Sequence, residues 1–272
     1  MSTNKHQQVK KRDEEFSQNI TTKIWEETPD IKNPYIAGSS RCHGYELTEL
    51  VEKCSYIEMF YLLFRGELPN KPEALLLEKL MVFLINPGPR HPATRAAMNA
   101  GVGKTDPEHI LPIGLTILGG AHLGAGEIEA AMRFLRKHSR RPATQVADDL
   151  LKNSSRPDEG DWHIVPGFGS RYGSVDLMPN EMANTLASLD DDWKVLKWGC
   201  EFSRSLAAHQ MGWLSTGLAA AVFADLGFQP RFGAGLFQLL NAPGLLAHGM
   251  EQANKPITAM PFVKDEDYVI EE

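Results

Sequence analysis

The chain is poor in cysteine and has no long apolar run, and each shortage excludes a class of protein. Only Cys42, Cys54 and Cys200 are cysteines among 272 residues. They match no metal-ligand spacing and form no even set, so we expect free thiols in a reducing compartment and no metal. No apolar run approaches the roughly 18–20 residues of a membrane helix, and the N-terminus lacks the apolar part of a secretory signal. We therefore expect a cytoplasmic protein that has no membrane partner.

Positive charge is also scarce. The net charge is −7, and the only basic runs are Lys10–Arg12 and Arg136–Arg141. This balance excludes nucleic acid as the main partner, and we predict that the second run is a solvated helix end. The chain is 42% hydrophobic and 23% charged, which suits one large domain, or one large and one small domain, with a buried core.

Strand-like alternation is nearly absent, whereas helical periodicity is common. We predict a polar tail over residues 1–23 and an all-α domain over 24–272, with any sheet limited to a short hairpin near Ile31–Leu47. Apolar residues recur at helical spacing in two segments: Leu47, Leu50, Val51 and Cys54, and then Ile128, Ala131, Met132 and Leu135. Each set predicts one buried helix face.

Turn residues divide the rest of the chain into further helices. We predict a loop over Lys152–Gly160 and a packed helix through Trp193, Leu196 and Cys200. The small residues Ala219, Ala220, Ala221 and Ala224 indicate close helix contact, either in a core or at a subunit interface. The remaining predicted helices are Glu73–Ile85, Ile110–Leu118, Gly217–Leu226, Phe232–Leu240 and Gly244–Gln252, the last two separated by Pro243.

Two glycine-rich segments, 119–127 and 164–171, carry the strongest chemical signal. Glycine allows a backbone to pass close to a ligand, and a helix start offers N–H groups to an anion. The first segment also holds His122, which can deliver a proton near neutral pH. Together they indicate a ligand with phosphates and a reacting carbonyl group.

Seven segments, in this order, give the chain a resemblance to a known family. They are 43–50 (HGYELTEL), 61–69 (YLLFRGELP), 119–127 (GGAHLGAGE), 165–169 (VPGFG), 225–228 (DLGF), 244–248 (GLLAH) and 261–269. The chain resembles the citrate synthase superfamily over about residues 20–272. It is most similar to the short citryl-CoA lyases and to the C-terminal lyase module of ATP-citrate lyase.

The resemblance implies a fold and a chemistry. The fold would be a citrate synthase-like helical fold with a large subdomain, a small subdomain at roughly 140–215, and the active site between them. The protein would be a homodimer or a higher homo-oligomer. It would make or break a carbon–carbon bond beside an acyl-CoA thioester, with coenzyme A as part of the substrate or product. In the family a carboxylate takes the α-proton, one histidine stabilises the enol oxygen, a second polarises a keto group, and arginines hold carboxylates.

Carried over to this sequence, the resemblance assigns three catalytic positions. His122 matches the first histidine, a donor suited to a developing oxyanion. Ser170 falls at the second histidine, and Thr216 falls at the carboxylate base, although threonine is no general base by itself. The predicted CoA-binding residues are Val165, Pro166, Gly167, Phe168, Gly169 and, for a phosphate, Arg171.

Other family positions also differ. Leu123 replaces a glycine, Leu214 replaces an asparagine, and Met178 and Asn241 fall where arginines are expected. Without these arginines the carboxylate clamps are missing, and an unpaired buried carboxylate costs several kcal/mol. The resemblance therefore predicts a partner other than oxaloacetate or citrate.

Two functions remain open at this stage. The first is an acyl-CoA carbon–carbon lyase or acyltransferase acting with a small keto or carboxylic acid. The alternative is a catalytically degenerate relative that binds CoA or serves as a non-catalytic companion subunit. His91, His163 and His209 could each replace a lost group, although a satisfied core or surface histidine is the commoner case.

Overall fold

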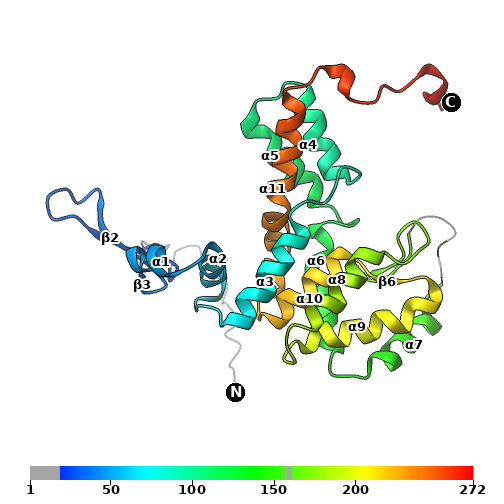
Figure 1. The fold of residues 1–272 in the computed structure, drawn as a ribbon, viewed down its shortest axis with the longest axis horizontal. Coiled ribbons are helices and arrows are strands. Elements are labelled where there is room, and N and C mark those ends of the chain that lie inside the picture. The colour runs from blue at the N-terminus through cyan, green and yellow to red at the C-terminus, as the bar shows by residue number, and fades with distance from the viewer. Residues whose placement is uncertain (1–18, 156, 158–160, 272) are drawn as a thin grey trace, which may run out of the picture. The chain divides into compact units, whose positions relative to one another are not determined.

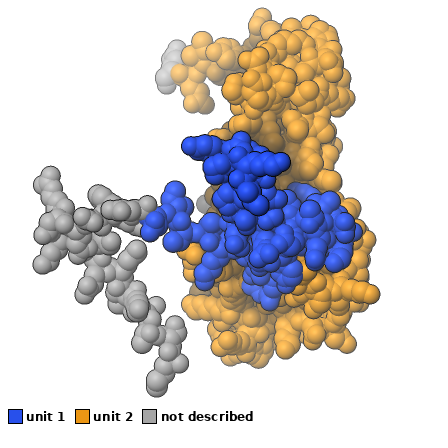
Figure 2. Space-filling model, turned by 90° about the vertical axis from the view of Figure 1, so that its left-hand side faces the viewer, with its two compact units in different colours: residues 1–67 blue, residues 68–272 orange. Residues whose placement is uncertain are grey.

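Helices dominate the computed structural model, which describes residues 19–155, 157 and 161–271 (Figure 1). The all-α expectation is confirmed. Residues 1–18 of the predicted tail, and residues 156 and 158–160 of the predicted loop, lie outside the described residues. Across the part that is described, every helix is too short or too polar to cross a membrane. The chain divides into two compact units, residues 1–67 and 68–272 (Figure 2).

The first unit begins with a small antiparallel sheet and continues into two helices. The sheet order is β1–β2–β3, and the turn after β1 forms because the Asp30 carboxylate accepts the N–H groups of Lys32 and Asn33. The predicted hairpin near Ile31–Leu47 is therefore part of a larger sheet that starts at Trp25. The elements are β1 (Trp25–Pro29), β2 (Ala37–Cys42), β3 (Tyr45–Glu46), α1 (Leu47–Lys53) and α2 (Tyr56–Arg65).

The second unit holds the remaining helices, and local sequence signals set several of their ends. The helix α3 begins at Lys71 because Asn70 and Glu73 form a capping box, in which each side chain accepts the other residue's backbone N–H. The helices are α3 (Lys71–Leu84), α4 (Pro92–Val102), α5 (Pro107–Leu118), α6 (Ile128–His138), α7 (Ala143–Asn153), α8 (Leu177–Ala187), α9 (Lys194–Leu206), α10 (Ser215–Asp225) and α11 (Gly233–Ala253). Short 3-10 turns lie at η1 (Ala125–Glu127), η2 (Ala207–His209), η3 (Pro230–Phe232), η4 (Ile257–Ala259) and η5 (Asp265–Asp267).

The prediction of two helices separated by Pro243 is wrong, because α11 runs through the proline. Proline normally interrupts a helix because it lacks an N–H and crowds the preceding turn. Here the N–H of the next residue, Gly244, donates to the carbonyl of Ile85 at the end of α3, at 2.9 Å. This tertiary hydrogen bond satisfies the group where the helical ladder is disturbed, and the helix continues.

A second three-stranded antiparallel sheet, which the sequence did not predict, lies in the second unit. Its order is β4–β5–β6, formed by His163–Val165, Phe168–Gly169 and Gly212–Trp213. Strands of two or three residues are too short to show an alternating pattern. Phe168 pairs with Trp213 across β5 and β6, and both side chains are buried.

The core of this region is aromatic and includes Trp193 and Trp198. Both tryptophans are buried. The Trp198 ring stacks on Phe202, and Phe202 meets Phe168 edge to face. The neighbouring helix α10 is buried on nearly all sides, including the small residues Ala219–Ala221, so these alanines pack in the core of the chain.

Two glycines let the segment between β4 and β5 lie directly on the start of α10. Gly167 has a φ of 84°, a left-handed conformation that favours glycine. A Cβ at Gly167 would lie 2.4 Å from the Gly217 Cα, and one at Gly217 would lie 2.0 Å from the Gly167 carbonyl oxygen. This close approach brings the second glycine-rich segment of the sequence against the start of α10.

Candidate active site

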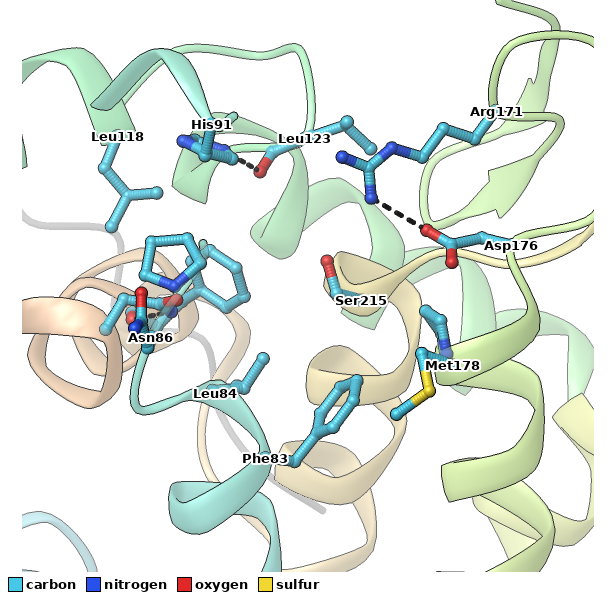
Figure 3. A pocket seen from close by; sticks show the side chains of 14 residues that line it. Phe83, Leu84, Asn86, His91, Leu118, Leu123, Arg171, Asp176, Met178 and Ser215 are labelled. Carbon is cyan, nitrogen blue, oxygen red and sulfur yellow. Dashed lines mark hydrogen bonds and ion pairs between the residues drawn. The ribbon is translucent and has the colours of Figure 1, made fainter. Parts of the chain in front are cut away.

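A cavity of about 340 Å³ opens within the second unit (Figure 3). Its wall comes from the end of α3, the segments around residues 118–123 and 171–179, the start of α10, and α11. The volume is that of a small-molecule site. The apolar lining residues are Phe83, Leu84, Pro87, Leu118, Leu123, Met178, Pro179 and Phe237, and the polar ones are Asn86, His91, Arg171, Asp176, Ser215 and Asn241.

The charge in this cavity is a single ion pair. Arg171 Nη1 lies 3.0 Å from Asp176 Oδ2, and the two side chains point toward each other in Figure 3. Among the described lining residues, Arg171 is the only arginine or lysine. Its Nε–H is buried and has no hydrogen-bond partner within the described chain. The cavity can therefore pair one anionic group with this guanidinium, in competition with Asp176.

His91 has a structural role in the cavity wall. Its Nδ1 accepts the N–H of Ala93 at the start of α4, so Nε2 carries the proton and donates to the Leu123 carbonyl at 3.2 Å. Burial lowers the pKa of His91 and favours the neutral ring. The bond holds Leu123, which has a φ of 53°, at the edge of the cavity. Both ring nitrogens are used, and His91 is not available to a substrate in this arrangement.

The three predicted catalytic residues do not themselves line the cavity within the described chain; a sequence neighbour of each does. Ser170 is buried, and its Oγ accepts the N–H of Trp162 at 3.2 Å. Thr216 is also buried, and its hydroxyl donates to a carboxylate described below. His122 is 65% exposed. The three neighbours that line the cavity are Leu123, Arg171 and Ser215.

Glu127, which the sequence did not single out as a site residue, joins the two glycine-rich segments to α10. It is only 8% exposed. Its Oε1 accepts the Gly167 N–H at 2.8 Å and faces His163 Nδ1 at 3.1 Å, and its Oε2 accepts the Thr216 hydroxyl at 2.6 Å. Burial opposes ionisation, but the hydrogen bonds from His163, Thr216 and Gly167 outweigh it and lower the pKa of Glu127. A buried carboxylate therefore organises this region.

His163 and His122 form a stacked pair of imidazoles next to that carboxylate. Their ring centroids are 5.7 Å apart, with an interplanar angle of 22°. The hydrogen bond to Glu127 raises the pKa of His163, against the effect of burial. On the other side, His122 Nε2 lies 4.0 Å from Asp161 Oδ2. Each imidazole of the pair thus has a carboxylate beside it, Glu127 for His163 and Asp161 for His122.

The predicted CoA-binding segment Val165–Gly169 is largely buried. The Gly167 N–H is used by Glu127, and the Gly167 carbonyl accepts the Leu214 N–H at 3.0 Å. The backbone of Gly167 is thus satisfied inside the protein, whereas Pro166 and Arg171 are partly exposed. A CoA contact by this segment stays a prediction, with Pro166 and Arg171 the residues that could reach a ligand.

Among the residues that the structure describes, one group of side chains lies close enough together to hold a metal ion. Asp106, Glu108 and His109, at the start of α5, have ligand atoms within 4.8 Å of one another. All three are exposed, and none of them lines the cavity. They are not part of the candidate active site.

The fold of this chain is similar to the folds of several solved structures. No family model and no curated protein sequence matches the chain. Among solved structures, it is similar to citryl-CoA lyase from Hydrogenobacter thermophilus, with a TM-score of 0.74 and 23% identity over 93% of this chain and 94% of that one. It is similar to ATP citrate lyase from Methanosaeta concilii in complex with (3S)-citryl-CoA, with a TM-score of 0.74 and 17% identity over 96% of this chain and 43% of that one.

A third similar structure is citrate synthase from Thermoplasma acidophilum with carboxymethyl-coenzyme A and oxaloacetate. The TM-score is 0.57 and the identity 19%, over 80% of this chain and 57% of that one. The chain thus spans nearly the whole of the citryl-CoA lyase but less than half of the ATP citrate lyase. It has the citrate synthase-like fold, and the predicted fold is confirmed.

Proposed function

We propose that this protein makes or cleaves a carbon–carbon bond beside an acyl-CoA thioester, with a partner acid that carries a single carboxylate. The fold is that of citryl-CoA lyase over nearly the full length of both chains. Similar structures hold citryl-CoA, or carboxymethyl-coenzyme A with oxaloacetate. We further propose that CoA meets the protein at Val165–Arg171, and that the protein is a cytoplasmic homodimer with a small subdomain at roughly 140–215.

The Arg171–Asp176 pair carries the proposal for the partner. A dicarboxylate or tricarboxylate needs a cation for each buried carboxylate. This cavity offers one guanidinium that is already 3.0 Å from an aspartate, and its family arginine positions hold Met178 and Asn241. The unpartnered Nε–H of Arg171 fits one carboxylate. The apolar remainder of the wall suits a short hydrocarbon chain, so a 2-keto monocarboxylate is the partner that matches best.

His122 is assigned to the thioester. Negative charge develops on the enol oxygen during the reaction, and a donor already in place stabilises it. The His122 side chain is exposed and next to Leu123 on the cavity wall. It can therefore meet a thioester carbonyl that approaches the cavity from solvent.

A second candidate function has one specific observation in its favour. Thr216 stands at the family's base position, and its hydroxyl is committed to Glu127 at 2.6 Å. No carboxylate stands at that position to remove an α-proton. This favours the alternative of a catalytically degenerate relative that binds CoA or serves as a non-catalytic companion subunit.

Three measurements on the full chain test the proposal. Calorimetry with CoA measures binding, and an absence of binding would reject the enzyme and the CoA-binding relative and leave only the companion subunit. Proton NMR of acetyl-CoA in deuterated water measures α-proton exchange, which the enzyme catalyses and the companion subunit does not. Formation of the condensed acyl-CoA from acetyl-CoA plus pyruvate, compared with acetyl-CoA plus oxaloacetate and followed by mass spectrometry, measures partner choice. We expect pyruvate to be preferred.

A matched pair of variants separates the role of His122 from a general effect. His122→Ala should abolish exchange and leave the thermal unfolding midpoint unchanged. His209→Ala removes another exposed histidine, in η2, and should leave exchange unchanged. Equal exchange by the two variants contradicts the assignment of His122.

A further inference from the structure

A second imidazole lies against His122, although the family's second-histidine position, Ser170, holds a serine that faces a backbone amide. That imidazole belongs to His163, on the strand paired with the one that leads to Ser170. The Cα register pairs His163 with Gly169, one residue before Ser170. The ring lies 5.7 Å from the His122 ring, centroid to centroid. Folding therefore places a second histidine beside His122, although the sequence has a serine at position 170.

We propose that His163 is the second histidine of the reaction, that its Nε2–H is the proton donor to the carbonyl oxygen of the partner acid, and that Glu127 is its positioning residue. This inference rests on the proposed function and names a catalytic residue for it. Three features of His163 carry it: its partner on Nδ1, the state of its Nε2, and the space made for its ring.

The first feature is the Glu127 carboxylate. It lies 3.1 Å from His163 Nδ1 and is itself fixed by the Gly167 N–H and the Thr216 hydroxyl. A carboxylate on Nδ1 fixes the ring orientation and stabilises the doubly protonated imidazolium. The titratable groups that face His163 are Glu127 from η1, Asp161 before β4 and His122 from the 119–127 segment. The two carboxylates both raise the pKa of His163.

The second feature is the opposite edge of the ring. His163 Nε2 is buried and has no hydrogen-bond partner within the described part of the chain. A buried donor without a partner is rare in native proteins because its lost hydration is not replaced. Neither His163 nor His122 is among the described residues that line the cavity, and the His122 side chain beside this edge is exposed, so a ligand would reach Nε2 past the His122 ring. A ligand oxygen would then satisfy Nε2.

The third feature is the space reserved for the ring. A Cβ at Gly169 would lie 2.4 Å from the Trp162 carbonyl oxygen, 2.9 Å from His163 Cα and 3.1 Å from His163 Cδ2. Glycine at the cross-strand position thus allows the close approach of the Trp162–His163 backbone and also leaves room for the imidazole. The Val-Pro-Gly-Phe-Gly segment makes room for His163 in addition to any contact with CoA.

Once the acyl-CoA enolate has formed, the bond-forming step balances with these groups. The α-carbon of the acyl-CoA enolate attacks the carbonyl carbon of the partner, and the new carbon–carbon bond forms as the thioester C=O is restored. The carbonyl π electrons of the partner move to its oxygen, which takes the Nε2 proton of the His163 imidazolium. His163 is left neutral, with Nδ1–H on Glu127. In the cleavage direction, neutral His163 takes the hydroxyl proton back as the bond breaks.

Two amide variants test the inference. His163→Asn removes the Nε2 donor, whereas Glu127→Gln keeps the imidazole and removes the negative charge beside Nδ1. His163→Asn places an amide near Nδ1, keeps a donor for Glu127 and removes the Nε2 donor. We expect at least 10-fold weaker pyruvate binding by calorimetry and about 100-fold slower condensation with pyruvate, while retained CoA binding shows that the variant is folded. Glu127→Gln should retain part of the pyruvate affinity and move the alkaline limb of the condensation rate to lower pH, a change that a merely structural role of His163 would not produce.

The outcomes separate the inference from the function it rests on. Wild-type pyruvate affinity in His163→Asn overturns the role of His163 and leaves the proposed function standing. The same holds if Glu127→Gln leaves the pH profile unmoved. If the wild-type chain binds neither CoA nor pyruvate, the proposed function fails, and the inference fails with it.

Discussion

The Thr216 hydroxyl donates a 2.6 Å hydrogen bond to Glu127 Oε2. These two residues are far apart in the sequence, and both are buried. The bond ties the start of α10 to the turn before α6, and the Gly167 N–H joins the same carboxylate. A residue expected to act in chemistry thus holds together the elements around the site.

The first prediction concerns this bond. Thr216→Val removes one of the donors that Glu127 accepts and leaves a buried carboxylate less satisfied, which should lower the free energy of unfolding by about 1.5–3 kcal/mol. Urea unfolding measures it. Thr216→Ser keeps the hydroxyl and is the control, with a loss limited to about 1 kcal/mol for one methyl group. Equal losses in the two variants would contradict a role for the hydrogen bond.

The second prediction is a pH dependence of stability from the Glu127–His163 pair. The pKa of Glu127 is lowered in the folded protein, so its contribution is present above its unfolded pKa and is lost as the pH falls through its folded pKa. The pKa of His163 is raised, so its contribution is present below its unfolded pKa and is lost as the pH rises through its folded pKa. The pair therefore stabilises most in the weakly acidic range.

Glu127→Gln should flatten both sides of that profile, because the remaining neutral side chain no longer favours the imidazolium. Urea unfolding of wild type and Glu127→Gln across the pH range measures the effect. Nitrogen NMR of labelled histidine should show that the pKa of His163 is lower in the variant. An unchanged His163 titration would show that the carboxylate does not hold the charge.

The third prediction concerns the cation in the cavity. Asp176→Asn removes the carboxylate that competes for Arg171 and should tighten pyruvate binding several-fold. Arg171→Met should weaken it at least 10-fold, because the carboxylate of the ligand then lacks a charged partner. Calorimetry with pyruvate measures both changes. If Arg171→Met binds pyruvate as wild type does, the carboxylate is held elsewhere.

The fourth prediction concerns Asp225 at the end of α10. Its carboxylate accepts the N–H groups of Val195 and Leu196 at the start of α9, at 2.9 and 2.8 Å. Burial outweighs these bonds and raises the pKa of Asp225 to about 6. A raised pKa means that the contribution of the group to stability is full below its unfolded pKa and falls as the pH rises toward 6.

Asp225→Asn cannot ionise, so its free energy of unfolding should lack this decline between about pH 4 and pH 6. Urea unfolding at several pH values, with wild type as the reference, measures the difference. A parallel pH dependence of the two proteins would mean that Asp225 is not the group that titrates there.

The fifth prediction concerns two glycines with different surroundings. Gly167→Ala should destabilise the protein by about 2 kcal/mol or more, because φ is 84° and the new Cβ would meet Gly217 at 2.4 Å. Gly235→Ala, in α11, meets nothing within 4 Å and should be neutral or stabilising by about 0.5–1 kcal/mol. Thermal unfolding compares them, and CoA calorimetry of Gly167→Ala reports whether the segment also serves the ligand.

Local signals in the sequence predicted most helices well. Helix α3 was expected at Glu73–Ile85 and lies at Lys71–Leu84, and α10 was expected at Gly217–Leu226 and lies at Ser215–Asp225. Apolar spacing and turn residues act over a few positions, so they can be read without knowing the fold. The prediction failed at Pro243, where a hydrogen bond from Gly244 to Ile85 carries the helix onward.

The candidate site was predicted only in outline. The segments around His122, Ser170 and Thr216 do meet, but the residues that line the cavity are their neighbours Leu123, Arg171 and Ser215. Glu127 opens a helical segment, and the sequence indicated either a helix-start role or the orientation of His122, not the contacts with Gly167, His163 and Thr216 that it makes. His163 belongs to a strand too short to predict. Adjacent residues point in different directions, so an error of one position selects the wrong side chain. Only tertiary packing determines which of the two faces the cavity.

By itself, the sequence determined the helical class, most helix positions and the glycines that permit a close approach, because these depend on local backbone preference. The tertiary structure alone decided that Glu127 binds Gly167, His163 and Thr216 together, and that His163 lies against His122. Those contacts join segments up to 89 residues apart. These contacts are stabilised by burial and by interactions between charged and polar groups that are distant in the sequence. A local sequence pattern contains no information about such pairs.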